Sequence, residues 1–200
     1  MRMKRLMILV AITLFGIQVQ GQDLTDKDSK RIDKKVDTFL GMMGDKNYTG
    51  VLDLMYPKFF EHQSKAQIFQ VFQLMQQAGI DIKFNEFEVL DKELISSSDD
   101  NKYALVKYRM DLQLPLNSDD LKGMAPMMVP MIENTFGKSN VEYNKSDSYI
   151  RVNAERYLMG VEDEKYSKDW MFLIYDSSFR SALEKTLPAE VNKIAGPKAF

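Results

Sequence analysis

Apolar residues in the first third of the chain recur with the period of a helix. From Ser29 to Gly44 they stand at i, i+4, i+7, i+8 and i+11, which is typical of a helix with one buried stripe. A second, shorter helix is predicted over Tyr48–Met55. Ser64-Lys65-Ala66-Gln67 has the form of a capping box and predicts the start of a third helix, which ends at Gly79.

The hydrophobic period changes from 3.6 to 2 residues at Ile80, which indicates a β-strand. Its phase slips by one residue at Asn85-Glu86, and such a slip predicts a β-bulge. Between Lys102 and Leu114 the alternation is regular, so this strand is predicted to have one buried and one polar face. Three further strands are predicted over Val141–Asn144, Ser148–Gly160 and Asp169–Asp176.

The remaining segments predict helices around and after the sheet. Asn117–Gly137 holds two prolines and four methionines and predicts one or two short inserted helices. A final helical segment runs from Ser178 to Ile194, and residues 196–200 are expected to be a disordered tail. The predicted class is therefore α+β, one domain over residues 29–195 with N-terminal helices packed on a bent antiparallel sheet, a Met-rich helical insertion and a C-terminal helix.

Residues 1–21 have the pattern of a cleavable signal peptide. A basic start, Met1–Arg5, precedes about 12 apolar residues, which span about 18 Å as a helix against the ~30 Å of a bilayer core. We expect cleavage between Gly21 and Gln22, a flexible leader over 22–28, and export to the periplasm or outside the cell without stable membrane insertion. The chain has no cysteine, so a lipoprotein is excluded.

Charge and composition narrow the possible partners and cofactors. Because Arg2, Lys4 and Arg5 leave with the signal, the net charge falls from −2 to about −5, which argues against a nucleic-acid partner. With no cysteine and a single histidine, zinc or iron sites of ordinary ligand type are not expected. The sequence contains no recognisable phosphate loop or nucleophile elbow, so we predict no cofactor.

The order of elements resembles the nuclear-transport-factor-2-like superfamily, which has a cone-shaped α+β fold. The resemblance is carried by Val36–Tyr56, with its helix Tyr48-Thr49-Gly50-Val51-Leu52-Asp53-Leu54, and by the strand Asp169-Trp170-Met171-Phe172-Leu173-Ile174-Tyr175. It implies helices lying across the concave face of a bent sheet. The superfamily includes isomerases, dehydratases and exported proteins without known activity, and none of its catalytic constellations can be placed on this chain.

Arg156 interrupts the apolar face of the strand predicted over Ser148–Gly160. Burying a guanidinium without a partner costs several kcal/mol, so it must pair or reach water. It could anchor a carboxylate-bearing or apolar small ligand. The cleft would then be lined by Phe59, Phe60, Phe84, Tyr108 and Trp170. Alternatively its stem packs in the core and its head reaches the rim or an internal acid.

His62 and a run of methionines each allow both a functional and a structural interpretation. His62, the single histidine, could form a general base with Asp53 or Glu61 in a cofactor-free isomerase, dehydratase or hydrolase, or it could be an exposed loop residue. The methionine run could supply soft thioether ligands for Cu(I). Two prolines argue against a single helix that aligns the sulfur atoms, so a lid or packing segment without a metal is favoured. That run consists of Met124, Met127, Met128 and Met131.

These patterns favour a non-catalytic domain that binds a small ligand or a partner. The alternative is the cofactor-free enzyme that uses His62. A third reading is a structural protein that forms a homodimer through the polar face of its sheet or through an unpaired strand edge.

Overall fold

The computed structural model describes residues 24–200, and the predicted signal peptide lies outside the described residues. Its helices are α1 (Asp26–Gly44), α2 (Tyr48–Leu54), α3 (Lys65–Gln77), α4 (Asp119–Phe136), α5 (Arg180–Thr186) and α6 (Ala189–Ala199). Its strands are β1 (Lys83–Ile95), β2 (Lys102–Pro115), β3 (Val141–Asn144), β4 (Tyr149–Glu162) and β5 (Met171–Ile174). Short 3₁₀ turns occupy Pro57–Glu61, Lys138–Asn140 and Ser177–Phe179. Within residues 24–200, no helix is both long and apolar enough to cross a membrane.

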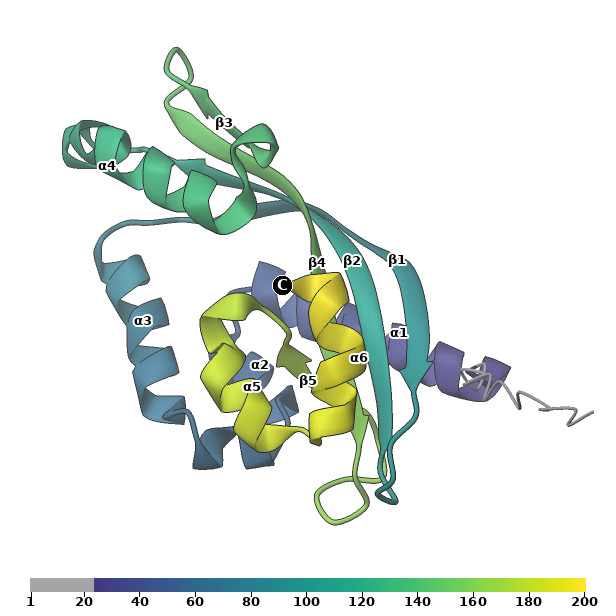
Figure 1. The fold of residues 1–200 in the computed structure, drawn as a ribbon. Coiled ribbons are helices and arrows are strands. Elements are labelled where there is room, and N and C mark those ends of the chain that lie inside the picture. Colours follow the sequence, from purple (N-terminus) through teal and green to yellow (C-terminus); the bar gives the residue numbers. More distant parts are fainter. Residues whose placement is uncertain (1–23) are drawn as a thin grey trace, which may run out of the picture.

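All strand pairs in the sheet are antiparallel, and the α+β class is confirmed. Strand order is β1-β2-β4-β3, with β5 also paired to β4. β2 and β4 pair along their whole length, from Lys102 opposite Glu162 to Pro115 opposite Tyr149. The register of β1 shifts between Phe84 and Glu86, where a bulge was predicted, and again between Val89 and Asp91. The sheet is strongly bent (Figure 1).

Helices cover both faces of the sheet at one end, whereas the resemblance implied helices on the concave face. Figure 1 shows α1 behind the strands and α6 in front of them. In β2, both Ala104 and its neighbour Leu105 are buried, although successive side chains in a strand point to opposite faces. α1 contributes a buried stripe, and its Phe39 ring lies 6.0 Å from that of Phe172 on β5.

The middle of the sheet keeps the predicted polar face. Here Lys107 of β2 pairs with Glu155 of β4 at 2.5 Å, and Arg109 pairs with Glu88 of β1 at 2.9 Å. Exposed ion pairs of this kind contribute only about 0–1 kcal/mol each. They pair the charged groups of the polar face but add little to the free energy of unfolding.

Both ends of the described chain are more ordered than the sequence suggested. α1 begins at Asp26, inside the predicted leader, because the Thr25 hydroxyl accepts a hydrogen bond from the Asp28 amide at 3.1 Å and caps the helix. α6 continues to Ala199 through the predicted disordered tail. The Phe200 ring stacks on Tyr175 with 4.9 Å between centroids, which holds the end of the chain against the core.

The Met-rich insertion forms one helix of 18 residues, α4, with Pro126 and Pro130 inside it. Leu121 and Ala125 are buried and anchor one side of this helix in a small hydrophobic cluster. The other members of that cluster are Leu114, Leu116 and Ile150. Both prolines are exposed, so their rings point away from the packed side.

We predict that the free energy of unfolding decreases above about pH 10. Burial raises the pKa of Tyr108 to about 12, against about 10 in an unfolded chain. The unfolded state therefore releases protons first, so the stabilisation is complete below pH 10 and is lost as the pH rises toward 12. Urea unfolding at several pH values measures this loss.

Tyr108→Phe should reduce the alkaline loss, while Tyr143→Phe on β3, where the residue is half-buried, serves as the control. Equal pH profiles for wild type and Tyr108→Phe would contradict the prediction.

Candidate functional site

Arg156, the predicted ligand anchor, is bound by the protein itself. It lies half-buried on β4, opposite Tyr108 of β2. Its Nη2 donates a hydrogen bond to the carbonyl oxygen of Thr135, and its Cζ lies 4.6 Å from the ring centroid of Phe136. Thr135 and Phe136 form the C-terminal end of α4, where carbonyls lack helical partners and a cation is favourable. Arg156 thus fastens α4 to the sheet.

The predicted cleft residues take part in separate ring contacts. Phe59 is buried and packs edge-on against Phe60 and Phe179, with centroids 5.9 and 5.8 Å away. Phe84 stacks on Phe87 of the same strand at 5.1 Å. These rings pack against the protein's own aromatic residues.

Tyr108 and Trp170 complete the predicted set, and both are buried. Tyr108 contacts Phe87 at 6.3 Å between centroids. Trp170 closes over Gly160 of β4, since one of its ring carbons lies 3.2 Å from the place of a Cβ atom there. Its indole Nε1 is buried, and within residues 24–200 it meets no hydrogen-bond acceptor.

The predicted catalytic pair is not assembled among the described residues. His62 is exposed at the end of the 3₁₀ turn Pro57–Glu61. Asp53 is also exposed, and its carboxylate is paired with Lys65 at 2.6 Å. Glu61 accepts a hydrogen bond from the Tyr166 hydroxyl at 3.4 Å. No hydrogen bond in residues 24–200 joins His62 to a carboxylate, so the enzyme reading lacks its required geometry.

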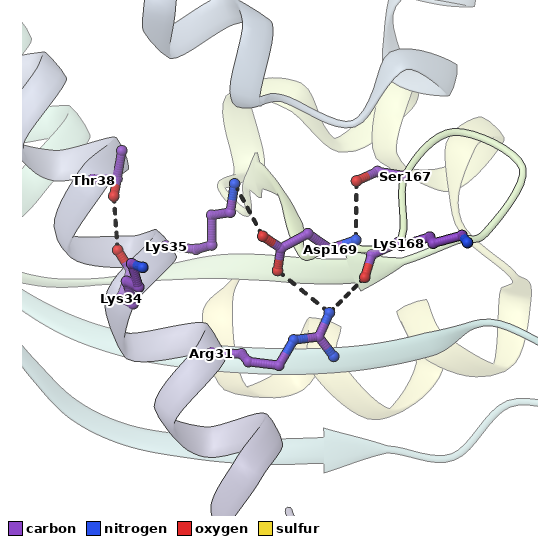
Figure 2. Close-up of a pocket in the computed structure, with 7 residues that line it drawn as sticks. All are labelled: Arg31, Lys34, Lys35, Thr38, Ser167, Lys168 and Asp169. Carbon is purple, nitrogen blue, oxygen red and sulfur yellow. Dashed lines mark hydrogen bonds and ion pairs between the residues drawn. The ribbon is translucent and has the colours of Figure 1, made fainter.

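A charged groove that the sequence reasoning did not find lies between α1 and the loop before β5 (Figure 2). It is open, with a volume of about 570 Å³. Its lining side chains are Arg31, Lys34, Lys35, Thr38, Ser167, Lys168 and Asp169.

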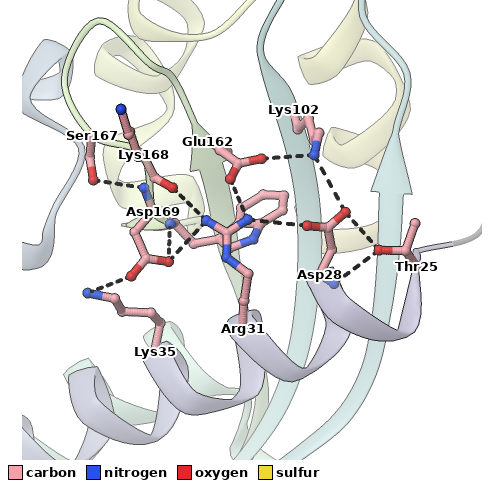
Figure 3. Close-up of polar contacts among 10 residues, drawn as sticks. Thr25, Asp28, Arg31, Lys35, Lys102, Glu162, Ser167, Lys168 and Asp169 are labelled. Carbon is pink, nitrogen blue, oxygen red and sulfur yellow. Dashed lines mark hydrogen bonds and ion pairs between the residues drawn. The ribbon is translucent and has the colours of Figure 1, made fainter.

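Arg31 is the centre of the ion pairs in this groove (Figure 3). Its Nη1 lies 2.6 Å from the Glu162 carboxylate and 3.3 Å from that of Asp28, and its Nη2 donates to the carbonyl of Lys168 at 2.6 Å. Lys102 pairs with both carboxylates, at 3.0 Å to Glu162 and 3.5 Å to Asp28. These contacts join α1 to β2, to the end of β4 and to the loop that follows.

The electrostatics of the groove are those of a structural network. Three cations (Arg31, Lys35 and Lys102) face three carboxylates (Asp28, Glu162 and Asp169). Burial opposes ionisation of Asp28, but the hydrogen bond from Thr25 and the charge of Lys102 outweigh it, so its pKa is lowered. The ion pairs of the network balance one another, and Lys34 and Lys168, exposed at the rim, leave the groove with an excess of positive charge.

Exposed apolar side chains instead gather on two helices. Of the six large hydrophobic residues that are exposed within residues 24–200, five lie on α3 and α4. On α3 they are Val71 (55% exposed) and Leu74 (62%), and on α4 they are Met124, Met127 and Met131. No residue of α3 is buried.

α3 is nevertheless held in place along its inner side. Its Phe72 ring stacks on Tyr48 of α2, with centroids 4.2 Å apart and planes 2° from parallel. Ile68 and Phe69 pack against the core as half-buried residues. The helix therefore presents its outer side, with Val71 and Leu74, from a supported position.

Comparison of this chain with protein-family models, with curated proteins and with solved structures finds no match. The resemblance to the nuclear-transport-factor-2-like superfamily therefore stays a prediction.

We predict that Arg31→Met lowers the free energy of unfolding by about 2–4 kcal/mol, because the largely buried carboxylates of Glu162 and Asp28 lose a shared partner. Lys34→Met, on the same helix and exposed, should change it by less than about 0.5 kcal/mol. Denaturant unfolding at neutral pH measures both variants. Equal stabilities for the two variants would show that the network does not hold α1.

Proposed function

We propose that this chain is an exported, non-catalytic interaction domain that associates with a second copy of itself through α3. The observation that carries the proposal is the exposed outer side of this helix. Five exposed residues on this side recur at i, i+3, i+4, i+7 and i+10, so they share one face of α3. We call them the α3 stripe: Gln67, Gln70, Val71, Leu74 and Gln77, all exposed.

The absence of charge from α3 beyond its first residue, Lys65, favours a second copy as the partner. Residues 66–80 contain no charged side chain, although 28% of the whole chain is charged. In a two-fold interface a surface patch meets its own copy, so a patch of one charge sign repels itself, whereas an uncharged patch does not. The rest of the mature domain, with its net charge of about −5, repels a second copy, and the α3 stripe is a surface where contact avoids that repulsion.

The polar residues of the stripe are self-complementary. Each glutamine amide both donates and accepts hydrogen bonds, so it can bond to the same residue type in another copy, which neither lysine nor glutamate can do. An antiparallel pair of α3 helices centred on the stripe places Val71 of one copy on Leu74 of the other. Two copies of the uncharged, partly apolar α3 stripe can thus pair with amide hydrogen bonds across the interface.

The other readings have less support. A carboxylate ligand held by Arg156 competes with the end of α4, where that guanidinium is engaged. Catalysis by His62 requires a carboxylate within hydrogen-bond reach. A role in association is also compatible with the resemblance to the nuclear-transport-factor-2-like superfamily, which includes exported proteins without known activity.

Sedimentation equilibrium of residues 22–200 across a wide concentration range tests the proposal. We expect a reversible dimer. Val71→Lys/Leu74→Lys should give a monomer with unchanged thermal stability, because both side chains are exposed and the new charges face each other. Met127→Lys, equally exposed on α4, should remain dimeric. A wild type that stays monomeric, or a dimer unaffected by the double substitution, would disprove association through α3.

A further inference from the structure

We propose that Met124, Met127 and Met131 of α4 form a binding site for a soft monovalent cation, Cu(I) or Ag(I). The proposal is independent of self-association, since it concerns a different helix. The three side chains are 43%, 58% and 62% exposed, so they do not belong to the core. We call them the methionine face.

The anchoring of α4 brings the three thioethers to one side of the helix. Leu121 and Ala125 are buried, and Met128 and Ile132 pack beside them, so the helix cannot rotate freely. At 100° per residue, Met124, Met127 and Met131 fall within an arc of about 60° next to that packed side. Two prolines were expected to prevent such an alignment, but α4 continues through both.

The spacing of the methionine face suits a shared ligand. Met124 and Met131 are separated by about 10 Å along the helix axis, and Met127 lies between them. Each side chain has three rotatable bonds and is partly exposed to solvent, so the sulfur atoms can converge over the central residue. Thioether sulfur is a neutral, soft ligand that selects Cu(I) over harder divalent ions.

The remainder of the described chain offers little competition for such an ion. Within residues 24–200, no group of three or more His, Cys, Asp or Glu side chains can hold a metal. The chain contains no cysteine, and its one histidine is exposed in a loop. Zinc and other borderline ions therefore have no built site in this part of the chain, whereas a soft ion has one.

The surroundings of the methionine face favour a cation. Residues 123–132 carry no charge, so no lysine or arginine of that stretch repels the ion. Asp119, Asp120 and Glu133 of the same helix outnumber Lys122, which is itself paired with Asp119 at 3.5 Å. The side chains of α4 thus carry a net charge of −2, which Arg156 at the end of the helix reduces to −1. This negative charge attracts a cation without supplying a hard ligand at the site.

The test is titration of residues 22–200 with silver nitrate in chloride-free buffer, followed by NMR of 13C-labelled methionine methyl groups. We expect one Ag(I) per chain and shifts in the resonances of the methionine face. Competition with a chromophoric Cu(I) chelator under anaerobic conditions then gives the Cu(I) affinity.

Leucine replacements separate metal binding from packing, because leucine keeps the volume and apolarity of methionine but lacks sulfur. Met124→Leu/Met127→Leu/Met131→Leu should abolish binding, and each single change should weaken it by about tenfold or more. The matched control replaces three half-buried methionines elsewhere, Met42→Leu/Met43→Leu/Met75→Leu, and should keep wild-type affinity. No Ag(I) binding by the wild type, or equal binding by the triple methionine-face variant, would overturn the proposal.

Discussion

The fold depends on the uninterrupted pairing of β2 with β4. These strands are in register over 14 residue pairs, and at one end their side chains are buried on both faces. Burying consecutive residues requires a cover on each side, and α1 and α6 supply it (Figure 1). The ion pairs of Arg31 and Lys102 with Glu162 then hold α1 against the start of β2 and the end of β4, beyond the buried apolar contacts. At the other end of the sheet α4 is the main cover, and Arg156 ties it down.

This arrangement explains why two helices keep apolar surface in solvent. α1 and α6 bury their apolar sides against a sheet that is already paired. α3 packs mainly on the short helix α2, and α4 contacts the sheet through Leu121 and Ala125. Neither helix has an element over its outer side in the part of the chain that the structure describes. Large side chains such as Leu74 and Met131 therefore stay exposed, and the surfaces available for binding are helical.

Much of the fold followed from local periodicity, while the proposed binding surfaces did not. The stripe of α1 and the bulge near Asn85 are visible because each is a property of neighbouring residues. The burial of Leu105 on the predicted polar face depends on α6, which follows about 80 residues later. From the sequence alone, Arg156 had the features of a ligand anchor. Its partner in the structure, the C-terminal end of α4, is brought next to it only by tertiary packing, which the sequence pattern does not show. In α3, the helical period separates the half-buried side, with Ile68, Phe69 and Phe72, from Val71 and Leu74, but it does not show that the outer side stays uncovered.

The two proposed binding surfaces differ chemically from the parts that hold the fold. The shifted pKa values of Asp28 and Tyr108 belong to the ion network and to the buried core, where ionisation is coupled to folding. The α3 stripe and the methionine face contain only amide, hydrocarbon and thioether groups, which do not titrate. Changes in pH therefore act on the stability of the domain and leave the binding groups themselves unaltered.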